Sequence, residues 1–374
     1  MTLKTSMERL NLHAFHAALG ARFAAVNQCE VVAEYGDYRA ESVALLRAVA
    51  VFDLSFRGRL CLTGADRMRF LHGQVTNDIK RLMTGQGCYA ALVSAKGRLE
   101  SDLNVYCLAD ELLLDFEPGL SAKLAERLNR FLVADEVQVV DVSSLYGLLS
   151  IQGPRAAEVV KQLALFDELP EAPFDFRAKS DQTLGELYLA RQPRVGTDGF
   201  DFFVPEAGLR AMADKLAAAA RAVGGVPGGW QALETARIEA GIPRYGVDMD
   251  ETSLPQECGI EHRAVSYTKG CYIGQEVLNR IHTMGHVNRN LRGLELSDEL
   301  QALPRWGDKI FHGGKEVGSV TSAVHSPRWN KNLALGYVRR EVDSPDAALV
   351  VIGAAGEITA RLAPLPFGSW KPRL

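Results

Sequence analysis

The spacing of apolar positions predicts a long mixed region followed by an all-β region. Apolar residues at helical spacing indicate helices, and alternating apolar and polar residues indicate strands. Helices are predicted at Met7–Phe23, Arg39–Ala50, Thr63–Leu71, Gly119–Leu132, Pro154–Phe166, Glu206–Val223 and Gly229–Ala240. Strands are predicted at Val51–Leu62, Cys88–Val93, Leu99–Leu108, Glu111–Phe116, Val137–Val142, Tyr146–Ile151, Leu184–Ala190 and Gly199–Val204.

Two further segments complete the predicted order. Asp167–Gln182 is rich in proline and acidic residues and is predicted to be a surface loop. From Val287 onward, short alternating runs separated by glycine turns indicate a β-barrel or sandwich. The β–α alternation before it is irregular, and no glycine-rich phosphate loop follows a strand. A doubly wound nucleotide-binding fold is therefore excluded, and an α+β fold is expected.

Composition and charge narrow the class of protein. The 374 residues suffice for roughly two or three domains. A net charge of −4 argues against stable binding of nucleic acid. No apolar run approaches the roughly 20 residues that span a bilayer, and Met1–Arg9 lacks the apolar stretch of a signal peptide. The six cysteines form no Cys-x-x-Cys pair, so a cytoplasmic protein without a zinc site or disulfide framework is expected.

Reactive side chains are concentrated in the octet Lys269–Glu276, Lys-Gly-Cys-Tyr-Ile-Gly-Gln-Glu. Loops that place reactive groups between glycines often serve a site. In an extended segment Lys269 and Cys271 would share a face, and the ammonium would lower the pKa of the thiol. The alternative is a cysteine that fills a small apolar hole. That alternative suits the cysteines beside apolar runs, whereas the polar neighbours of Cys271 favour a functional thiol.

A second candidate is the turn Gly196–Asp201, which ends at the start of a predicted strand. Asp201 would point away from Phe200 and Phe202. A carboxylate can accept two hydrogen bonds from a planar N–H edge, such as the 2-amino group and N3 of a pterin. The alternative is a turn aspartate that binds local backbone N–H groups, and this stretch alone favours the alternative.

The strand Leu99–Leu108 carries a third candidate. Asp102 and Asn104 share one face by alternation. They could line a cleft, where Asp102 would accept a proton, or simply face solvent, and the sequence leaves both open.

Two other groups of polar residues are weaker candidates. His282 and His286 are four apart but lack an evident third ligand, so no metal site is predicted. Arg191, Arg194 and Arg263 could bind an anionic group, although single arginines are commonly solvated surface residues.

Together these stretches resemble the aminomethyltransferase (glycine cleavage T-protein) superfamily over nearly the whole chain. The segments that carry the resemblance are Val51–Ser55 with Gly58 and Arg59, Thr63–Asp66, Phe70–Asp78, Gly196–Asp201, Arg237–Gly241, Gly318–Ser322 and Lys331–Val338. The octet matches the "KGCY-GQE" motif of the folate-binding YgfZ-type proteins within this superfamily, and T-proteins lack that cysteine motif.

The resemblance implies an α+β fold of the T-protein type, a three-domain ring of two α+β domains and a C-terminal barrel-like domain. The predicted division is a discontinuous α+β domain of residues 1–50 plus 140–245, an α+β domain of residues 51–139, a connecting segment of residues 246–286 that holds the octet, and a β-barrel domain of residues 287–374.

The resemblance also suggests functional residues. The family's pterin-binding glutamate falls on Asp201, one methylene shorter. The family's pair of aspartates falls on Ser101 and Asp102, so one acid is lost. An arginine that contacts folate in T-proteins falls on Leu233.

The first hypothesis is a protein that binds tetrahydrofolate, or a one-carbon derivative of it, and supports iron–sulfur cluster assembly or repair. Cys271 would act at the folate cleft and Lys269 would tune its thiol, while Tyr272, Gln275 and Glu276 would orient the loop and contact the folate. Its partners would be reduced folate and iron–sulfur client proteins. The alternatives are an aminomethyltransferase that uses Asp102 for acid–base catalysis, and a non-catalytic folate-binding scaffold. Whether the protein turns over a substrate stays open.

Overall fold

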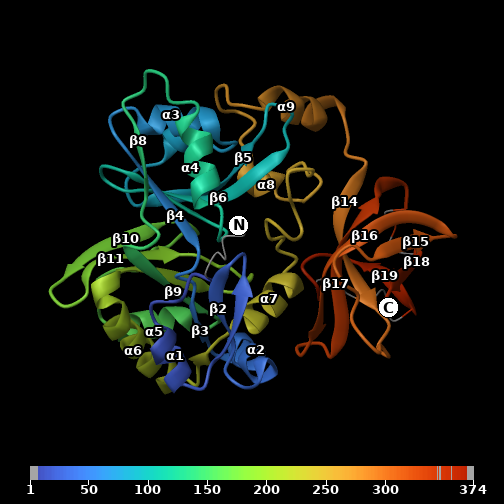
Figure 1. The fold of residues 1–374 in the computed structure, drawn as a ribbon, viewed down its shortest axis with the longest axis horizontal. Coiled ribbons are helices and arrows are strands. Elements are labelled where there is room, and N and C mark those ends of the chain that lie inside the picture. Colours follow the sequence, from blue (N-terminus) through green and yellow to red (C-terminus); the bar gives the residue numbers. More distant parts are fainter. Residues whose placement is uncertain (1–6, 343, 345–346, 355, 369–374) are drawn as a thin grey trace, which may run out of the picture. The chain divides into compact units, whose positions relative to one another are not determined.

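The computed structural model describes residues 7–342, 344, 347–354 and 356–368 (Figure 1). The predictions for Met1–Arg9 and for the end of the barrel therefore fall partly outside the described residues. The chain forms two compact units. Unit 1 comprises the chain up to Ala90 together with Asp102–Leu233, and unit 2 comprises Ala91–Ser101 together with the chain from Glu234 onward. This division is coarser than the four-part division suggested by the sequence, which stays a prediction.

A six-stranded sheet forms the larger part of unit 1, in the order β10-β11-β12-β9-β3-β13. Its strands are β3 (Ala50–Asp53), β9 (Tyr146–Gln152), β10 (Phe176–Asp181), β11 (Gly185–Arg191), β12 (Gly199–Pro205) and β13 (Val226–Pro227). All neighbours are antiparallel except β13 and β3. The helices of this part of the chain are α1 (His13–Ala18), α2 (Tyr38–Arg47), α5 (Ala156–Gln162) and α6 (Glu206–Ala222).

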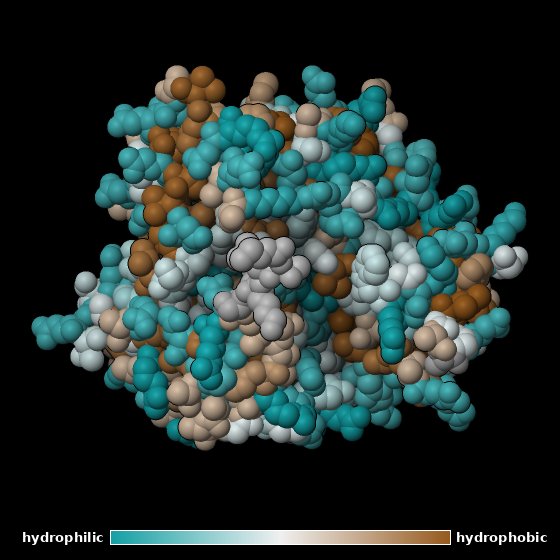
Figure 2. All heavy atoms as spheres, in the orientation of Figure 1, coloured by the Kyte–Doolittle hydropathy of each residue, from teal (hydrophilic) through white to brown (hydrophobic). Residues whose placement is uncertain are grey.

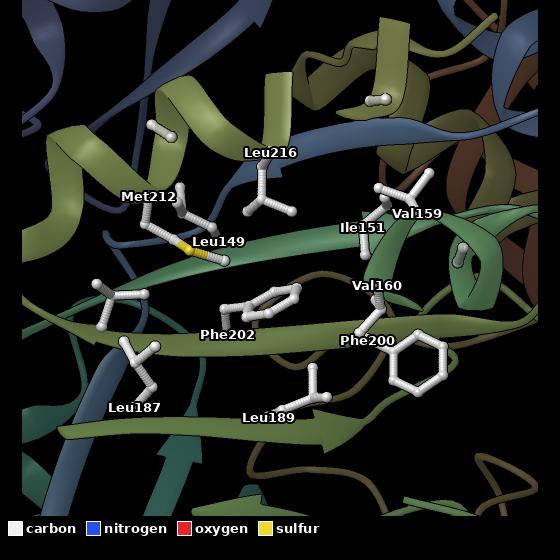
Figure 3. Close-up of a cluster of buried hydrophobic side chains, with 14 of the residues drawn as sticks. Leu149, Ile151, Val159, Val160, Leu187, Leu189, Phe200, Phe202, Met212 and Leu216 are labelled. Carbon is white, nitrogen blue, oxygen red and sulfur yellow. The ribbon is translucent and has the colours of Figure 1, made fainter. Parts of the chain in front are cut away.

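One face of this sheet is covered by α5 and α6, as Figure 3 shows. The buried residues at this contact include Leu149, Ile151, Val159, Val160, Leu187, Leu189, Phe200, Phe202, Met212 and Leu216. Side chains alternate between the two faces of a strand. Because Phe200 and Phe202 face the helices, Asp201 between them faces the opposite side. Ser150, the partner of Asp201 in the register of β9 and β12, faces that side as well.

A five-stranded sheet has the order β5-β6-β7-β4-β8. Its strands are β4 (Gly58–Thr63), β5 (Gln86–Val93), β6 (Leu99–Cys107), β7 (Leu112–Phe116) and β8 (Gln138–Asp141). The same region contains α3 (Arg67–Gln74), a short 3-10 helix η1 (Ile79–Arg81) and α4 (Ser121–Asn129). A two-stranded sheet, β1 (Arg22–Val26) with β2 (Cys29–Glu34), completes unit 1.

Unit 2 contains a closed six-stranded barrel of the order β14-β17-β16-β15-β18-β19. Its strands are β14 (Arg289–Leu296), β15 (Lys309–His312), β16 (Lys315–Ser326), β17 (Lys331–Arg339), β18 (Ala348–Gly353) and β19 (Gly356–Ala363), with a 3-10 helix η2 (Arg340–Val342) after β17. Before the barrel lie α8 (Glu261–Ala264) and α9 (Gln275–Met284), and α7 (Trp230–Glu239) ends in this unit. The predicted α+β class with a C-terminal β-barrel is confirmed.

Three predicted elements are wrong in part. The single strand expected at Val51–Leu62 is two strands, β3 and β4, separated by a turn. The helix expected at Met7–Phe23 is only α1, because the chain turns at Gly20 with a φ of 81° and continues into β1. The loop expected at Asp167–Gln182 contains β10, which lies at the edge of its sheet and pairs with β11. Phe176 is the only buried residue of β10, which explains why apolar alternation did not reveal the strand.

The surface of the protein is mixed. The face shown in Figure 2 is mainly hydrophilic, with apolar residues between the polar ones. The most exposed large apolar side chains include Met83, Val133, Met284 and Trp306. Of the helices described, none combines the length and the apolar character needed to cross a membrane.

Candidate functional site

Polar side chains from the six-stranded and the five-stranded sheet meet on the face of β12 that the helices leave uncovered. Tyr106 of β6 packs its ring on Phe203 of β12, with ring centroids 5.5 Å apart. Asp201 lies two residues before Phe203 and is fully buried. A buried carboxylate requires a charged or hydrogen-bonding partner, because burial without one is strongly unfavourable.

That partner is Arg194, from the loop between β11 and β12. Its Nε lies 2.9 Å from Asp201 Oδ2 and 3.2 Å from Oδ1, and its Nη2 lies 2.6 Å from Oδ2. Nη2 also donates to Asp115 Oδ2 at 3.0 Å. One arginine therefore joins a carboxylate of the six-stranded sheet to a carboxylate of β7 in the five-stranded sheet.

The ion pairs continue beyond Asp115. Arg57, in the connection between β3 and β4, donates from Nε to Asp115 Oδ1 at 2.8 Å and from Nη1 to Glu117 Oε1 at 2.5 Å. Asn104 donates to Asp115 Oδ2 at 2.8 Å. We call the five charged residues Glu117, Arg57, Asp115, Arg194 and Asp201 the charge network. The charges alternate in sign along the network, so each buried charge lies beside at least one of opposite sign.

The network fixes the charge of its central members. Burial by itself would raise the pKa of Asp115, but the guanidinium groups of Arg57 and Arg194 hold that pKa well below its usual value. Burial would also lower the pKa of Arg194, and Asp201 and Asp115 instead raise it above its usual value. Asp115 is thus an anion and Arg194 a cation at neutral pH.

Asp102, on β6 beside the network, differs from Asp115. Burial, followed by the negative charge of Glu117, raises the pKa of Asp102 to about 6. The hydroxyl of Tyr89 donates to Asp102 Oδ2 at 2.8 Å. A carboxyl group with a pKa near neutrality can both accept and release a proton under physiological conditions, which is the property of a general base or acid.

Arg59 is a further buried cation of this region. Its Nη2 donates to the carbonyl oxygens of Ser55, Ser143 and Tyr146 at 3.1, 2.6 and 2.7 Å. Its Nε and Nη1 are buried and have no hydrogen-bond partner among the described residues. Burial, offset in part by Asp115, lowers the pKa of Arg59 to about 10.

The octet of unit 2 adopts a conformation that the sequence did not predict. The segment before Gly274 has a bend at Lys269 and a turn at Ile273, and it forms no strand. Lys269 is therefore buried, with Nζ 4.8 Å from the centre of the Tyr272 ring, whereas Cys271 is exposed. The expectation that Lys269 and Cys271 share a face is wrong, because side chains two apart alternate regularly only in extended backbone.

The second half of the octet begins a helix. Gly274 precedes α9 with a φ of 85°, and Gln275 and Glu276 lie in the first turn of α9. A Cβ on Gly274 would lie 2.6 Å from the carbonyl oxygen of Ser94 and 2.8 Å from Val93 Cγ2. The octet therefore packs closely against the hairpin Ala91–Ser101, which belongs to the same unit.

The predicted site residues thus fall into two groups. Asp102 and Asp201 lie in unit 1 beside or within the charge network, and Lys269, Cys271, Tyr272, Gln275 and Glu276 lie in unit 2. The roles assigned to all seven remain predictions. No group of three potential metal ligands occurs among the described residues, and the ring of His282 stacks on Tyr267 at 3.7 Å.

Sequence reasoning missed Arg57, Asp115 and Glu117. A signal was present, because Asp115 and Glu117 interrupt an otherwise apolar strand at alternate positions, in Leu112–Glu117. Acids on one face of an apolar strand indicate a buried charged site rather than a solvated face.

Comparison with known proteins defines the class. Residues 12–269 match the family model described as the GCVT N-terminal domain, and residues 289–368 match the glycine cleavage T-protein C-terminal barrel domain. The chain therefore belongs to the glycine cleavage T-protein (GCVT) family.

Individual relatives resemble the chain over almost its whole length. An aminomethyltransferase of Symbiobacterium thermophilum is 31% identical over 376 residues, covering 98% of each chain. An aminomethyltransferase of Lysinibacillus sphaericus is 29% identical over 363 residues, covering 96% of this chain and 95% of that protein. The crystal structure of the glycine cleavage system aminomethyltransferase T from Bartonella henselae superposes with a TM-score of 0.86 at 24% identity, over 97% of this chain and 98% of that one. That structural likeness establishes the shared fold.

Proposed function

We propose that the protein binds a reduced folate and catalyses one-carbon transfer of the aminomethyltransferase type. The observation that carries the proposal is Asp102, whose pKa is raised to about 6 beside the buried charge network. Membership of the GCVT family and the aminomethyltransferase names of its relatives support the same function. This was the second of the sequence-based hypotheses, and the whole-length similarity to aminomethyltransferases favours it over the first.

The residues of unit 1 suit a folate substrate. Tetrahydrofolate supplies a secondary amine nitrogen that takes up a one-carbon unit. Asp102 would hold or accept the proton exchanged at that nitrogen, and Tyr89 would keep its carboxyl group oriented through the 2.8 Å hydrogen bond. Glu117 would keep the pKa of Asp102 close to neutrality, because its negative charge disfavours a second anion nearby. The buried hydroxyl of Tyr106 lacks a partner among the described residues, so the site retains polar capacity for a ligand.

The direct test is binding followed by turnover. Purified protein should bind tetrahydrofolate, and together with the other components of glycine cleavage it should support exchange of glycine with bicarbonate. Asp102→Asn should lower the exchange rate by about 10²- to 10⁴-fold while binding persists. Asp110→Asn, an exposed aspartate between β6 and β7, is the matched control and should leave the rate unchanged. Absence of folate binding would contradict the proposal.

Binding without exchange would favour the non-catalytic scaffold. Ser101 gives that outcome a physical basis, because it is a fully buried hydroxyl where the family resemblance places a second acid.

A second candidate function is support of iron–sulfur enzymes, as in the YgfZ-type proteins. The observation that favours it is the exposure of Cys271. Among the six cysteines, four are buried, Cys88 is partly buried and Cys271 is exposed. A thiol must be accessible to react with a ligand or a partner protein.

This second candidate is tested in cells that lack the protein. Cys271→Ala should fail to restore the activity of iron–sulfur enzymes, while Cys88→Ala should restore it fully. Equal rescue by both variants would exclude a role for the Cys271 thiol. Measurement of glycine cleavage in the same cells would separate the two proposed functions.

A further inference from the structure

Asp201, the residue expected to hold a pterin, already uses its hydrogen-bond acceptors within the protein. Its side chain has no solvent exposure, and both of its oxygens accept hydrogen bonds from Arg194. The side chain of Ser150 also donates to it. A carboxylate in this state cannot accept the paired N–H groups of a pterin unless the buried ion pair with Arg194 first breaks, which is costly.

Arg194 keeps one part of its guanidinium group available. Nε and Nη2 are engaged by Asp201 and Asp115, whereas Nη1 donates no hydrogen bond to any described residue. Nη1 is not buried, and the Arg194 side chain is 10% exposed. Two carboxylates therefore orient the arginine and leave Nη1 facing outward. A preorganised guanidinium loses little entropy when it binds an acceptor.

The chemistry of a guanidinium is the reverse of that of a carboxylate. Arginine carries only donors, so it recognises acceptor atoms such as a carbonyl or carboxylate oxygen. A reduced pterin presents donors at N3 and its 2-amino group and an acceptor at its 4-carbonyl oxygen. We propose that Arg194 recognises the 4-carbonyl oxygen of the pterin, and that Asp201 positions Arg194 instead of binding the ring. This inference rests on the proposed binding of reduced folate and specifies how the ring is recognised.

A ligand comparison on the unaltered protein tests the inference first. The probes are tetrahydrofolate, 6-methyltetrahydropterin, which lacks the benzoylglutamate part, and tetrahydroaminopterin, in which an amino group replaces the 4-carbonyl. Titration calorimetry without oxygen should show tetrahydroaminopterin binding about 10- to 100-fold more weakly than tetrahydrofolate, because a donor then faces a donor. Equal or tighter binding of tetrahydroaminopterin would overturn the inference.

Two variants test whether Arg194 causes the weaker binding of tetrahydroaminopterin. Arg194→Gln combined with Asp201→Asn leaves no unpaired buried charge at the pair, since Asp115 keeps Arg57. This double variant should bind tetrahydrofolate about 10- to 100-fold more weakly and should no longer discriminate against the 4-amino analogue. Asp201→Asn alone should stay within about 5-fold of the wild-type affinity and keep the discrimination, because Asp115 still orients Arg194. Circular dichroism should show the same folded state in each variant.

The remaining outcomes separate the two proposals. If Asp201→Asn loses binding while the protein is folded, Asp201 holds the ring and the inference is wrong. If 6-methyltetrahydropterin binds equally to wild type and double variant while only tetrahydrofolate binding falls, Arg194 binds the glutamate carboxylate and ring recognition is again wrong. If wild-type protein binds no reduced folate at all, the proposed function itself fails, and the inference fails with it.

Discussion

The charge network of unit 1 and the octet of unit 2 are positioned by different forces. The network is held by side chains, since each of its carboxylates is fixed by an arginine from another part of the chain. The octet is held by its backbone, since Gly274 has a φ of 85° and lies against the backbone of Ser94. The first arrangement depends on charge, and the second depends on the absence of a side chain.

This difference determines what each region tolerates. Removing a member of the network leaves a buried charge without its partner, which is among the most destabilising changes in a protein. Adding a single methyl group at Gly274 of the octet forces backbone atoms apart. Substitutions can therefore distinguish positioning by side-chain ion pairs from positioning by close backbone packing.

The largest effect is expected for Asp115→Ala. Asp115 has no solvent exposure and accepts hydrogen bonds from Arg57, Arg194 and Asn104. Its removal should lower the free energy of unfolding by about 3–5 kcal/mol, because two buried guanidinium groups lose their shared anion. Asp214→Ala, an exposed partner of Arg210 in α6, should cost about 0–0.5 kcal/mol. Urea denaturation followed by circular dichroism measures both, and similar losses for the two variants would contradict a side-chain-held network.

Gly274→Ala should produce the next largest effect. Gly246 has the same φ of 85° but no atom within 4 Å of an added Cβ, so Gly246→Ala is a matched control. The control should cost about 1 kcal/mol through backbone strain alone. Gly274→Ala should cost about 2–3 kcal/mol, because its Cβ would also collide with Ser94. Denaturation curves give the difference, and equal losses would show that close packing does not position the octet.

Arg59→Met tests whether a buried arginine outside the charge network contributes as much to stability as a member of the network. Arg59 is as buried as the members of the network, but two of its three nitrogens have no partner among the described residues. Methionine restores apolar volume and removes these unpaired donors, although three carbonyl groups lose a hydrogen bond. We expect a net loss of about 1–2 kcal/mol in denaturation experiments. A loss as large as that of Asp115→Ala would place Arg59 within the network.

The octet was evident in the sequence and the charge network was not, for a physical reason. The octet is contiguous, so its unusual composition appears in eight successive residues. The network joins residues from four segments, and ion pairs of Asp115 with Arg57 and Arg194, which lie 58 and 79 positions away in the sequence, bring them together. The alternation of Asp115 and Glu117 with apolar residues indicates buried acids, but no local pattern identifies Arg57 and Arg194 as their partners, because a single arginine resembles a solvated surface charge.

For Arg194 the sequence indicated the right kind of binding partner but did not identify the residue. The sequence indicated that Arg194 could bind an anionic group and that Asp201 could bind a planar pair of donors. Asp201 is an anionic group of the kind expected for Arg194, and the Arg194 guanidinium is a planar pair of donors of the kind expected for Asp201. In the structure these two side chains, seven positions apart, bind one another. Helix and strand periodicity predicted most of the elements, since those depend on local burial. Which polar groups satisfy each other depends on tertiary contacts that periodicity does not contain.

The smallest predicted effect concerns the pH dependence of stability. The pKa of Asp102 is raised to about 6 in the folded protein, above the value of about 4 usual for an unfolded chain. Between these two values the folded state binds more protons, so stability should fall as pH rises from about 4 to 6 and then level off. Asp115 has the opposite sign, because its lowered pKa stabilises the fold above pH 4 and the contribution is lost only in stronger acid.

Asp102→Asn should therefore gain stability relative to wild type as pH rises through this window. A gain of about 1 kcal/mol is expected between pH 4 and 7, because Asp102 retains some contact with solvent that reduces the effect of burial. The difference between Asp110→Asn and wild type should stay constant over the same range, since Asp110 is exposed. Urea denaturation at half-unit steps of pH measures both differences. A pH-independent difference for Asp102→Asn would show that this carboxyl group titrates normally, and it would remove the main support for its role as a proton acceptor near neutral pH.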